Sequence, residues 1–115
     1  MHFGLTDEQQ MIVDTVRSFV ENEIYPHEDL VERTGEVPKE IAQDIKQKTI
    51  DLGFYACNFP ESVGCAGLSH LEFALVEREL GRGSMALNHF FGRPQNILMA
   101  CEGEQVDRYL MPAVR

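Results

Sequence analysis

The chain has 115 residues, the size of one domain, and its 43% hydrophobic and 25% charged residues are the balance of a globular protein. The formal charge of −9 disfavours binding to nucleic acid and to anionic membrane surfaces, because such a field repels phosphate groups. It would also repel the phosphates of a nucleotide, and the sequence holds no cluster of three or more Lys or Arg to offset this.

The cysteines and the first residues indicate in which cellular compartment the chain resides. Cys57, Cys65 and Cys101 are an odd number without C-x-x-C spacing, which predicts reduced thiols in a cytoplasmic chain rather than a disulfide framework or a zinc site. The start, Met1 to Gly4, shows no basic segment followed by an apolar run, so we expect no secretion signal. No stretch approaches the roughly 20 apolar residues of a membrane span.

The first predicted helix begins at Thr6, where Thr6-Asp7-Glu8-Gln9 has the spacing of a capping box. Apolar residues then recur at steps of three and four along one helical face: Ile12, Val16, Phe19, Val20 and Ile24. Pro26 predicts the end of this helix, because proline lacks a backbone donor and disfavours helical geometry in the residue before it. Residues 27–37 are then expected to form a connector with one helical turn.

A second amphipathic helix is predicted after this connector. Pro38 suits its first turn and Gly53 its C-terminal cap. Its apolar face carries Ile41, Ile45, Thr49 and Leu52. Residues 54–60 are short and apolar, as a buried strand would be. No second strand is present to pair with them, so we expect extended chain crossing the core.

Three further helices are predicted in the second half of the chain. Residues 64–67 form a tight loop, and Ser69-His70-Leu71-Glu72 is a second capping box at the start of a helix that ends around Gly81 to Gly83. Ser84 is expected to cap a fourth helix running toward Gly103, with a kink or break at Pro94. A last helix starts near Glu104. The pattern predicts an all-α fold, an orthogonal or up-down bundle of about five to six helices.

Groups that could carry chemistry are few. Glu77 and Glu79 flank Arg78, and neighbours in a helix point about 100° apart, so we interpret them as a solvated helix face rather than a carboxylate pair. The glycine loop at 64–67 lacks a nucleotide-binding pattern, and no histidine stands near Cys65 to activate it. The histidines show no metal-binding spacing and are interpreted as surface or capping residues: His2, His27, His70 and His89. We therefore predict no catalytic, cofactor-binding or metal-binding residue.

The segment from Met85 to Gly92 is more informative. It places two aromatic residues and a methionine around the small residues Ala86 and Gly92, ahead of the bend expected at Pro94. Small residues and a bend can open a groove beside a helix. Ordinary core packing is the alternative, and the residues alone favour it.

Two runs, Phe59–Leu68 and Val76–Arg82, together resemble the acyl-CoA dehydrogenase family. In that family a Pro-Glu and Gly-rich turn leads into a helix that ends in an acidic-Glu-Leu-small-Arg segment. The opening Leu5–Gln9 and the closing Glu104–Pro112 are similar to the family's first helix and domain end. The resemblance spans essentially the whole chain, and it identifies residues 1–115 as an N-terminal helical domain without the family's middle β-domain and C-terminal helical domain.

The resemblance implies a flavoenzyme that desaturates an acyl-CoA thioester between its α and β carbons. A glutamate removes the α proton while FAD accepts the β hydride. In the family the other two domains hold the flavin and the glutamate, so the chain alone is expected to bind no FAD and to be inactive. Acyl-CoA and an electron acceptor are the implied partners. The N-terminal domain walls one side of the acyl pocket, a role that falls here on Asn88, Phe91, Gly92 and Gln95.

Family members often place a glycine where Cys65 stands. A positive φ at that position would cost a cysteine about 1 kcal/mol. The face that meets the other domains is expected to be apolar and to self-associate. Two other readings stay open: a stand-alone, non-enzymatic helical interaction module from a split or truncated gene, and a bundle that itself binds small molecules.

Overall fold

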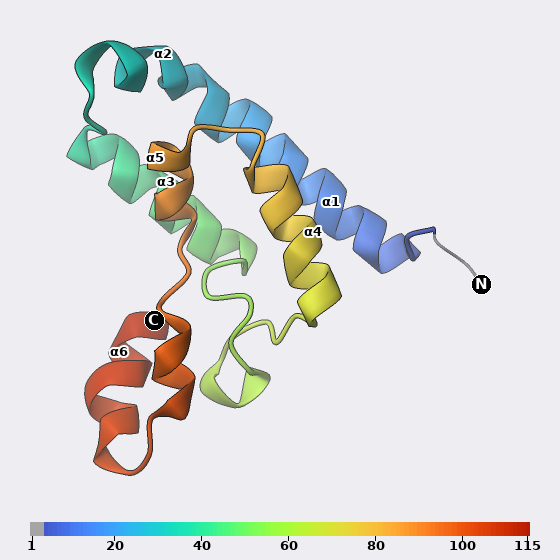
Figure 1. The fold of residues 1–115 in the computed structure, drawn as a ribbon, viewed down its shortest axis with the longest axis vertical. Helices are drawn as coiled ribbons and strands as arrows, with labels where there is room; N and C mark the ends of the chain where they lie inside the picture. Colours follow the sequence, from blue (N-terminus) through green and yellow to red (C-terminus); the bar gives the residue numbers. More distant parts are fainter. Residues whose placement is uncertain (1–3) are drawn as a thin grey trace.

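A computed structural model describes residues 4–115, and these residues form helices, turns and loops without a strand (Figure 1). The prediction of an all-α fold is confirmed. The statements made above about the first residues and His2 fall outside the described part of the chain. The fold is flat, with extents of 45 × 43 × 21 Å. None of the helices within residues 4–115 is long and apolar enough to cross a bilayer.

Helix α1, Asp7–Phe19, begins at the predicted capping box. Oγ1 of Thr6 accepts a hydrogen bond from the backbone N–H of Gln9, and Oε1 of Gln9 accepts one from the N–H of Thr6, both at 3.1 Å. These bonds satisfy two backbone donors that the first helical turn would leave unpaired. The predicted start of the first helix is therefore confirmed.

The prediction that Pro26 ends this helix is wrong. The helix continues as a π-helical segment, Val20–Ile24, and then as α2, Tyr25–Thr34. The N–H of Tyr25 reaches back five residues to the carbonyl of Val20, which widens the turn ahead of the proline. Pro26 then occupies the first turn of α2, where no intrahelical donor is required. Most of the connector predicted at 27–37 is consequently helix.

Helix α3, Lys39–Leu52, starts directly after Pro38 and ends at Gly53, whose φ of 79° is the left-handed cap expected there. The prediction of extended chain over residues 54–60 is wrong. The segment makes tight turns, with a hydrogen bond of 2.9 Å from the N–H of Phe59 to the carbonyl of Ala56. Ala56 is fully buried and has a φ of 53°, so its backbone bends where a strand would run straight.

A 3₁₀ turn at Glu61–Val63 leads to α4, His70–Leu80. The second capping box is confirmed: Oγ of Ser69 accepts from the N–H of Glu72 at 3.2 Å, and the Glu72 carboxylate accepts from the N–H of Ser69 at 3.0 Å. The hydrogen bonds to Ser69 hold the pKa of the Glu72 carboxyl below its usual value.

The fourth predicted helix is broken into pieces, as expected around Pro94. Helix α5, Met85–Asn88, continues as a 3₁₀ turn, His89–Phe91. The chain then leaves helical geometry at Gly92 and resumes as a 3₁₀ segment, Asn96–Ala100. Ser84 caps α5 without a side-chain bond, and its N–H instead donates to Glu28 at 2.7 Å.

The last helical stretch starts at Glu104, where it was predicted. It consists of a π-helical segment, Val106–Leu110, followed by α6, Met111–Val114. As at Pro26, the proline here, Pro112, lies at the beginning of an α-helix that follows a π turn.

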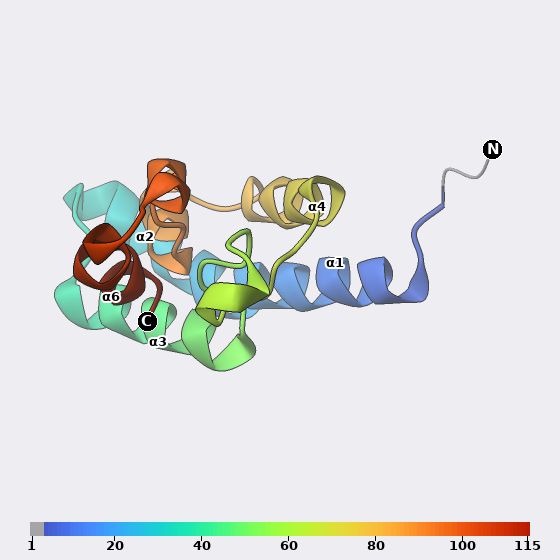
Figure 2. The same cartoon turned by 90° about the horizontal axis from the view of Figure 1, so that it is seen from below.

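The core joins these elements in two clusters. Figure 2 shows α4 lying over α1, with α3 on the same level as α1. The larger cluster of buried side chains comprises Val16, Phe19, Val20, Ile24, Val31, Ile45, Val76, Leu80, Leu87 and Phe91. The smaller cluster, Ala56, Phe59 and Leu110, attaches the C-terminal part of the chain to the turns after α3.

Candidate functional site

The four residues that the resemblance assigns to the acyl pocket lie in three different surroundings. Gly92 and Gln95 border one groove of about 670 Å³. Asn88 borders a second pocket of about 370 Å³. Phe91 is 4% exposed and packs edge-on against Phe19, with ring centroids 5.3 Å apart. The structure therefore brings two of the four together, and Phe91 belongs to the core.

Gly92 forms the floor of the groove with Tyr55. Its φ of 89° is one that side chains rarely adopt, and a Cβ added there would overlap the Tyr55 ring. The carbonyl of Gly92 accepts the N–H of Ala56 at 3.0 Å, and the Tyr55 hydroxyl donates to the carbonyl of Ala113 at 2.8 Å. The close approach that glycine permits thus fixes the aromatic ring between two distant parts of the chain.

The groove is lined by residues of α3, by the irregular segment around Gly92, and by Pro112 and Ala113. Its lining includes three basic side chains, Lys39, Lys46 and Arg93, and no Asp or Glu. Sequence reasoning missed this basic cluster, because α3 and the segment around Arg93 lie far apart in the sequence.

The pocket beside Asn88 combines Arg93, which is paired with Glu77, with two buried acceptor oxygens. Nδ2 of Asn88 donates to the carbonyls of Leu80 and Gly83, which leaves its Oδ1 buried and without a partner. Oε1 of Glu77 borders the same pocket and is also buried without a partner, while its Oε2 pairs with Arg93. Two unpartnered acceptors favour a hydrogen-bond donor in this pocket.

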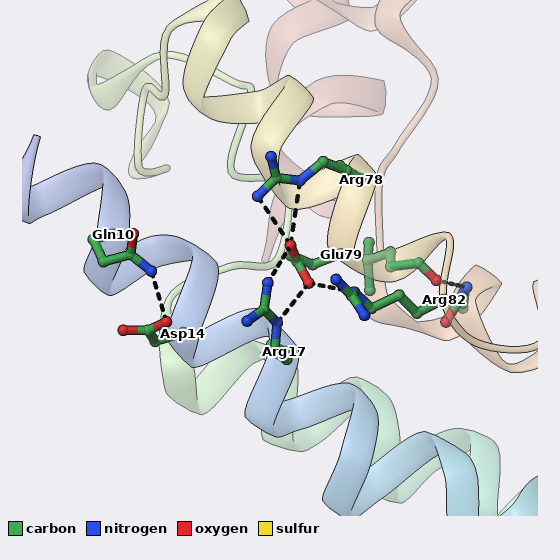
Figure 3. A network of polar contacts seen from close by, with 8 residues as sticks. Gln10, Asp14, Arg17, Arg78, Glu79 and Arg82 are labelled. Atoms are coloured by element: carbon green, nitrogen blue, oxygen red, sulfur yellow. Dashed lines mark hydrogen bonds and ion pairs between the residues drawn. The ribbon is translucent and has the colours of Figure 1, made fainter. Parts of the chain in front are cut away.

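The interpretation of Glu79 as part of a solvated helix face is wrong. Its side chain is fully buried, where α4 crosses α1. Figure 3 shows the Glu79 carboxylate surrounded by three guanidinium groups. Arg17 on α1 donates from Nε and Nη2 at 3.1 Å each, and Arg82 donates from Nε at 2.7 Å. Arg78 contacts the remaining face of Oε1 at 3.1 and 3.3 Å.

This network explains the titration of Glu79 and its role. The hydrogen bonds from Arg17 lower the pKa of the carboxyl against the opposing effect of burial, and Arg78 and Arg82 lower it further. A carboxylate held by three cations is fixed as an ion and has no free lone pair with which to take a proton from a substrate. Glu79 is therefore a brace between α1 and α4 rather than a candidate base.

All three cysteines are free thiols. Burial raises the pKa of Cys57 to about 11, and burial also raises the pKa of Cys65. Ala56 is the single non-glycine residue with positive φ among residues 4–115, so the backbone cost considered for Cys65 does not arise. Over the same residues, no group of three or more His, Cys, Asp or Glu side chains is placed to hold a metal ion.

Residues 4–115 form a small all-α domain that carries a basic groove. The sequence profile of the acyl-CoA dehydrogenase N-terminal domain matches residues 6–115, and the chain belongs to this family. The structure has no significant match among solved structures.

Three curated relatives illustrate the similarity. Benzylmalonyl-CoA dehydrogenase of Aromatoleum aromaticum is 38% identical over 87 residues, which covers 76% of this chain and 22% of that protein. 3-(Aryl)acrylate reductase of Clostridium sporogenes is 30% identical over 115 residues, 96% of this chain and 29% of that protein. A probable acyl-CoA dehydrogenase of Bacillus subtilis is 37% identical over 91 residues, 77% of this chain and 23% of that protein. The chain thus matches less than a third of the length of each.

Proposed function

We propose that this domain serves a cytoplasmic, FAD-dependent acyl-CoA dehydrogenase by forming one wall of its acyl pocket. The observation that carries the proposal is the groove floored by Gly92 and bordered by Gln95, inside the region that matches the family. Tyr55, Phe90 and Leu98 give this groove an apolar lining suited to an acyl chain. Two of the relatives named above are called dehydrogenases of CoA compounds, which supports an acyl-CoA thioester as substrate.

In such an enzyme FAD would accept the hydride from the β carbon of the acyl group. The residues described here do not fit the flavin by themselves. The pocket beside Asn88 presents unpartnered oxygens that would repel pyrophosphate, and the cations of the groove are exposed side chains without a backbone cradle. This chain contributes binding and the exclusion of water, and the flavin and the proton-abstracting base belong to other parts of the enzyme.

The test uses the natural, full-length gene product. We expect it to show a flavin absorption band and to reduce an electron-accepting dye when supplied with an acyl-CoA. Gln95→Ala is expected to raise KM for acyl-CoA several-fold with unchanged flavin content. Gln47→Ala, an exposed glutamine of α3 outside the groove, is the matched control. A full-length product that contains no flavin and oxidises no acyl-CoA would refute the proposal.

A second candidate is a non-enzymatic interaction module, and exposed apolar side chains favour it. Met85 is 86% exposed and Ile97 is 76% exposed, so each presents a large apolar side chain to solvent. Either a partner protein or a second copy of the chain could cover them. Sedimentation of the 115-residue chain distinguishes the cases, because self-association predicts a mass that increases with concentration and is reduced by Ile97→Ser.

A further inference from the structure

The basic groove is unexpected on a chain whose net charge is −9. Asp and Glu outnumber Lys and Arg by 19 to 10, yet the residues lining the groove include three of the ten bases and none of the acids. A local cluster of one sign against a background of the other is a selective feature for a ligand, because the field focuses within the concave surface.

Two of the cations are free to meet an anion. Lys39 and Lys46 lie two helical turns apart on α3 and therefore face the same side, with Gln43 between them. Neither forms an ion pair with any residue in the described part of the chain. Lys48 on the same helix differs, because its Nζ lies 2.7 Å from both Glu23 and Asp44. The third groove cation, Arg93, is paired with Glu77.

Most of the remaining side chains that line the groove are apolar, and Gln43, His89 and Gln95 are its neutral polar members. Tyr55, Phe90, Pro94 and Leu98 supply rings and aliphatic surface, and Nζ of Lys46 lies 5.2 Å from the centroid of the Tyr55 ring. The volume of about 670 Å³ falls within the roughly 300–1,000 Å³ of small-molecule pockets. A ligand that matches both features has an apolar body and an anionic end.

We propose that this groove binds an organic carboxylate, with the carboxylate near Lys39 and Lys46 and the apolar body over Tyr55. The ligand could be a free carboxylic acid or an acyl thioester that carries a carboxylate at its far end, and both share the same chemistry. Binding is non-covalent and takes place in the groove assigned above to the acyl pocket. The thioester ligand therefore rests on the proposed function, and the free acid does not.

The test is a two-dimensional amide NMR titration of the 115-residue chain with octanoate and, separately, with the uncharged octanamide. Octanoate is expected to shift the amides of Tyr55, Gly92 and Ala113 and to half-saturate at a concentration about fivefold lower than octanamide. The double variant Lys39→Gln/Lys46→Gln is expected to lose this advantage. Lys48→Gln removes one positive charge from the same helix outside the groove and is expected to retain it.

A second pair of ligands separates the two sources. Hexanoyl and adipyl thioesters of N-acetylcysteamine differ by the terminal carboxylate and carry no phosphate. Preferential binding of the adipyl thioester assigns the groove to carboxylate-ended acyl groups, and binding of octanoate alone assigns it to free acids. Equal binding of octanoate and octanamide, shifts confined to another surface, or no binding at all would overturn the proposal. No arm uses flavin or turnover, so this failure is distinct from a failure of the proposed enzyme function.

Discussion

Replacing Glu79 by Gln should destabilise the domain by about 2–4 kcal/mol, although the side chain keeps its size. The carboxylate accepts five N–H contacts from Arg17, Arg78 and Arg82. An amide keeps one acceptor oxygen and turns its own N–H groups toward the guanidinium donors. Several charge-assisted bonds are therefore lost or opposed at a fully buried site.

The size of the stability loss depends on whether water can hydrate the three guanidinium groups after the substitution. Their side chains are between 39% and 55% exposed, so water can hydrate the guanidinium groups again. The loss is therefore smaller than the sum of five charged bonds, each of which could contribute about 1.5–3 kcal/mol. Most of the cost comes from the buried position of residue 79, which becomes poorly satisfied.

Lowering the pH should reduce the difference in unfolding free energy between wild type and Glu79→Gln. The pKa of Glu79 is lower in the folded than in the unfolded chain, where it is about 4.3, so its contribution is complete above that value. The contribution disappears as the pH falls through the lower, folded-state pKa. The gap in unfolding free energy between wild type and Glu79→Gln should thus narrow as the pH is lowered from neutral to about 3.

The assay is urea unfolding followed by far-UV circular dichroism at several pH values. Glu32→Gln removes one exposed carboxylate that forms no ion pair with the described residues and should change the stability by less than about 0.5 kcal/mol. A Glu79→Gln protein as stable as the Glu32→Gln control near neutral pH would refute the argument. A gap that stays constant down to pH values where carboxylates are protonated would refute its electrostatic part.

Three other outcomes follow from the structure. Gly92→Ala should cost at least about 2 kcal/mol in urea unfolding, because its Cβ would displace Tyr55. Gly103→Ala also has positive φ but open space, and should cost only about 1 kcal/mol. Ser69→Ala should lower the stability by about 1 kcal/mol through loss of the α4 cap, measured by the same unfolding curves. Cys57 should resist iodoacetamide at pH values below its raised pKa and react once urea unfolds the chain, as peptide mass spectrometry would show.

Features set by neighbouring residues could be predicted from the sequence. The capping boxes at Thr6 and Ser69 depend on contacts across three residues, and both form as the pattern indicates. The cap at Gly53 follows from the left-handed φ that glycine adopts without strain. In each case the physical cause lies within one helical turn, so tertiary packing does not alter the result.

Features that depend on residues far apart in the sequence were missed, because their causes lie outside a single helical turn. The partner that buries Glu79 is Arg17, 62 residues away in the sequence, and helical geometry around position 79 says nothing about it. The basic groove combines α3 with the segment at Arg93, which no local charge count detects. One signal was present in the sequence, because Arg78 and Arg82 lie within three residues of Glu79 and their positive charges favour a buried carboxylate there.

The rule that proline ends or kinks a helix is correct locally, yet it predicted a wrong helix end at Pro26. Proline forbids the ordinary i to i−4 bond, which leaves a stop or a kink as the expected results. The chain uses a third solution twice, with a π turn closed five residues back to Val20 ahead of Pro26 and to Val106 ahead of Pro112. The second π turn has a consequence for the groove, because it places Ala113 where its carbonyl accepts the Tyr55 hydroxyl. The aromatic floor of the groove therefore depends on a backbone irregularity that restores helical geometry after the proline.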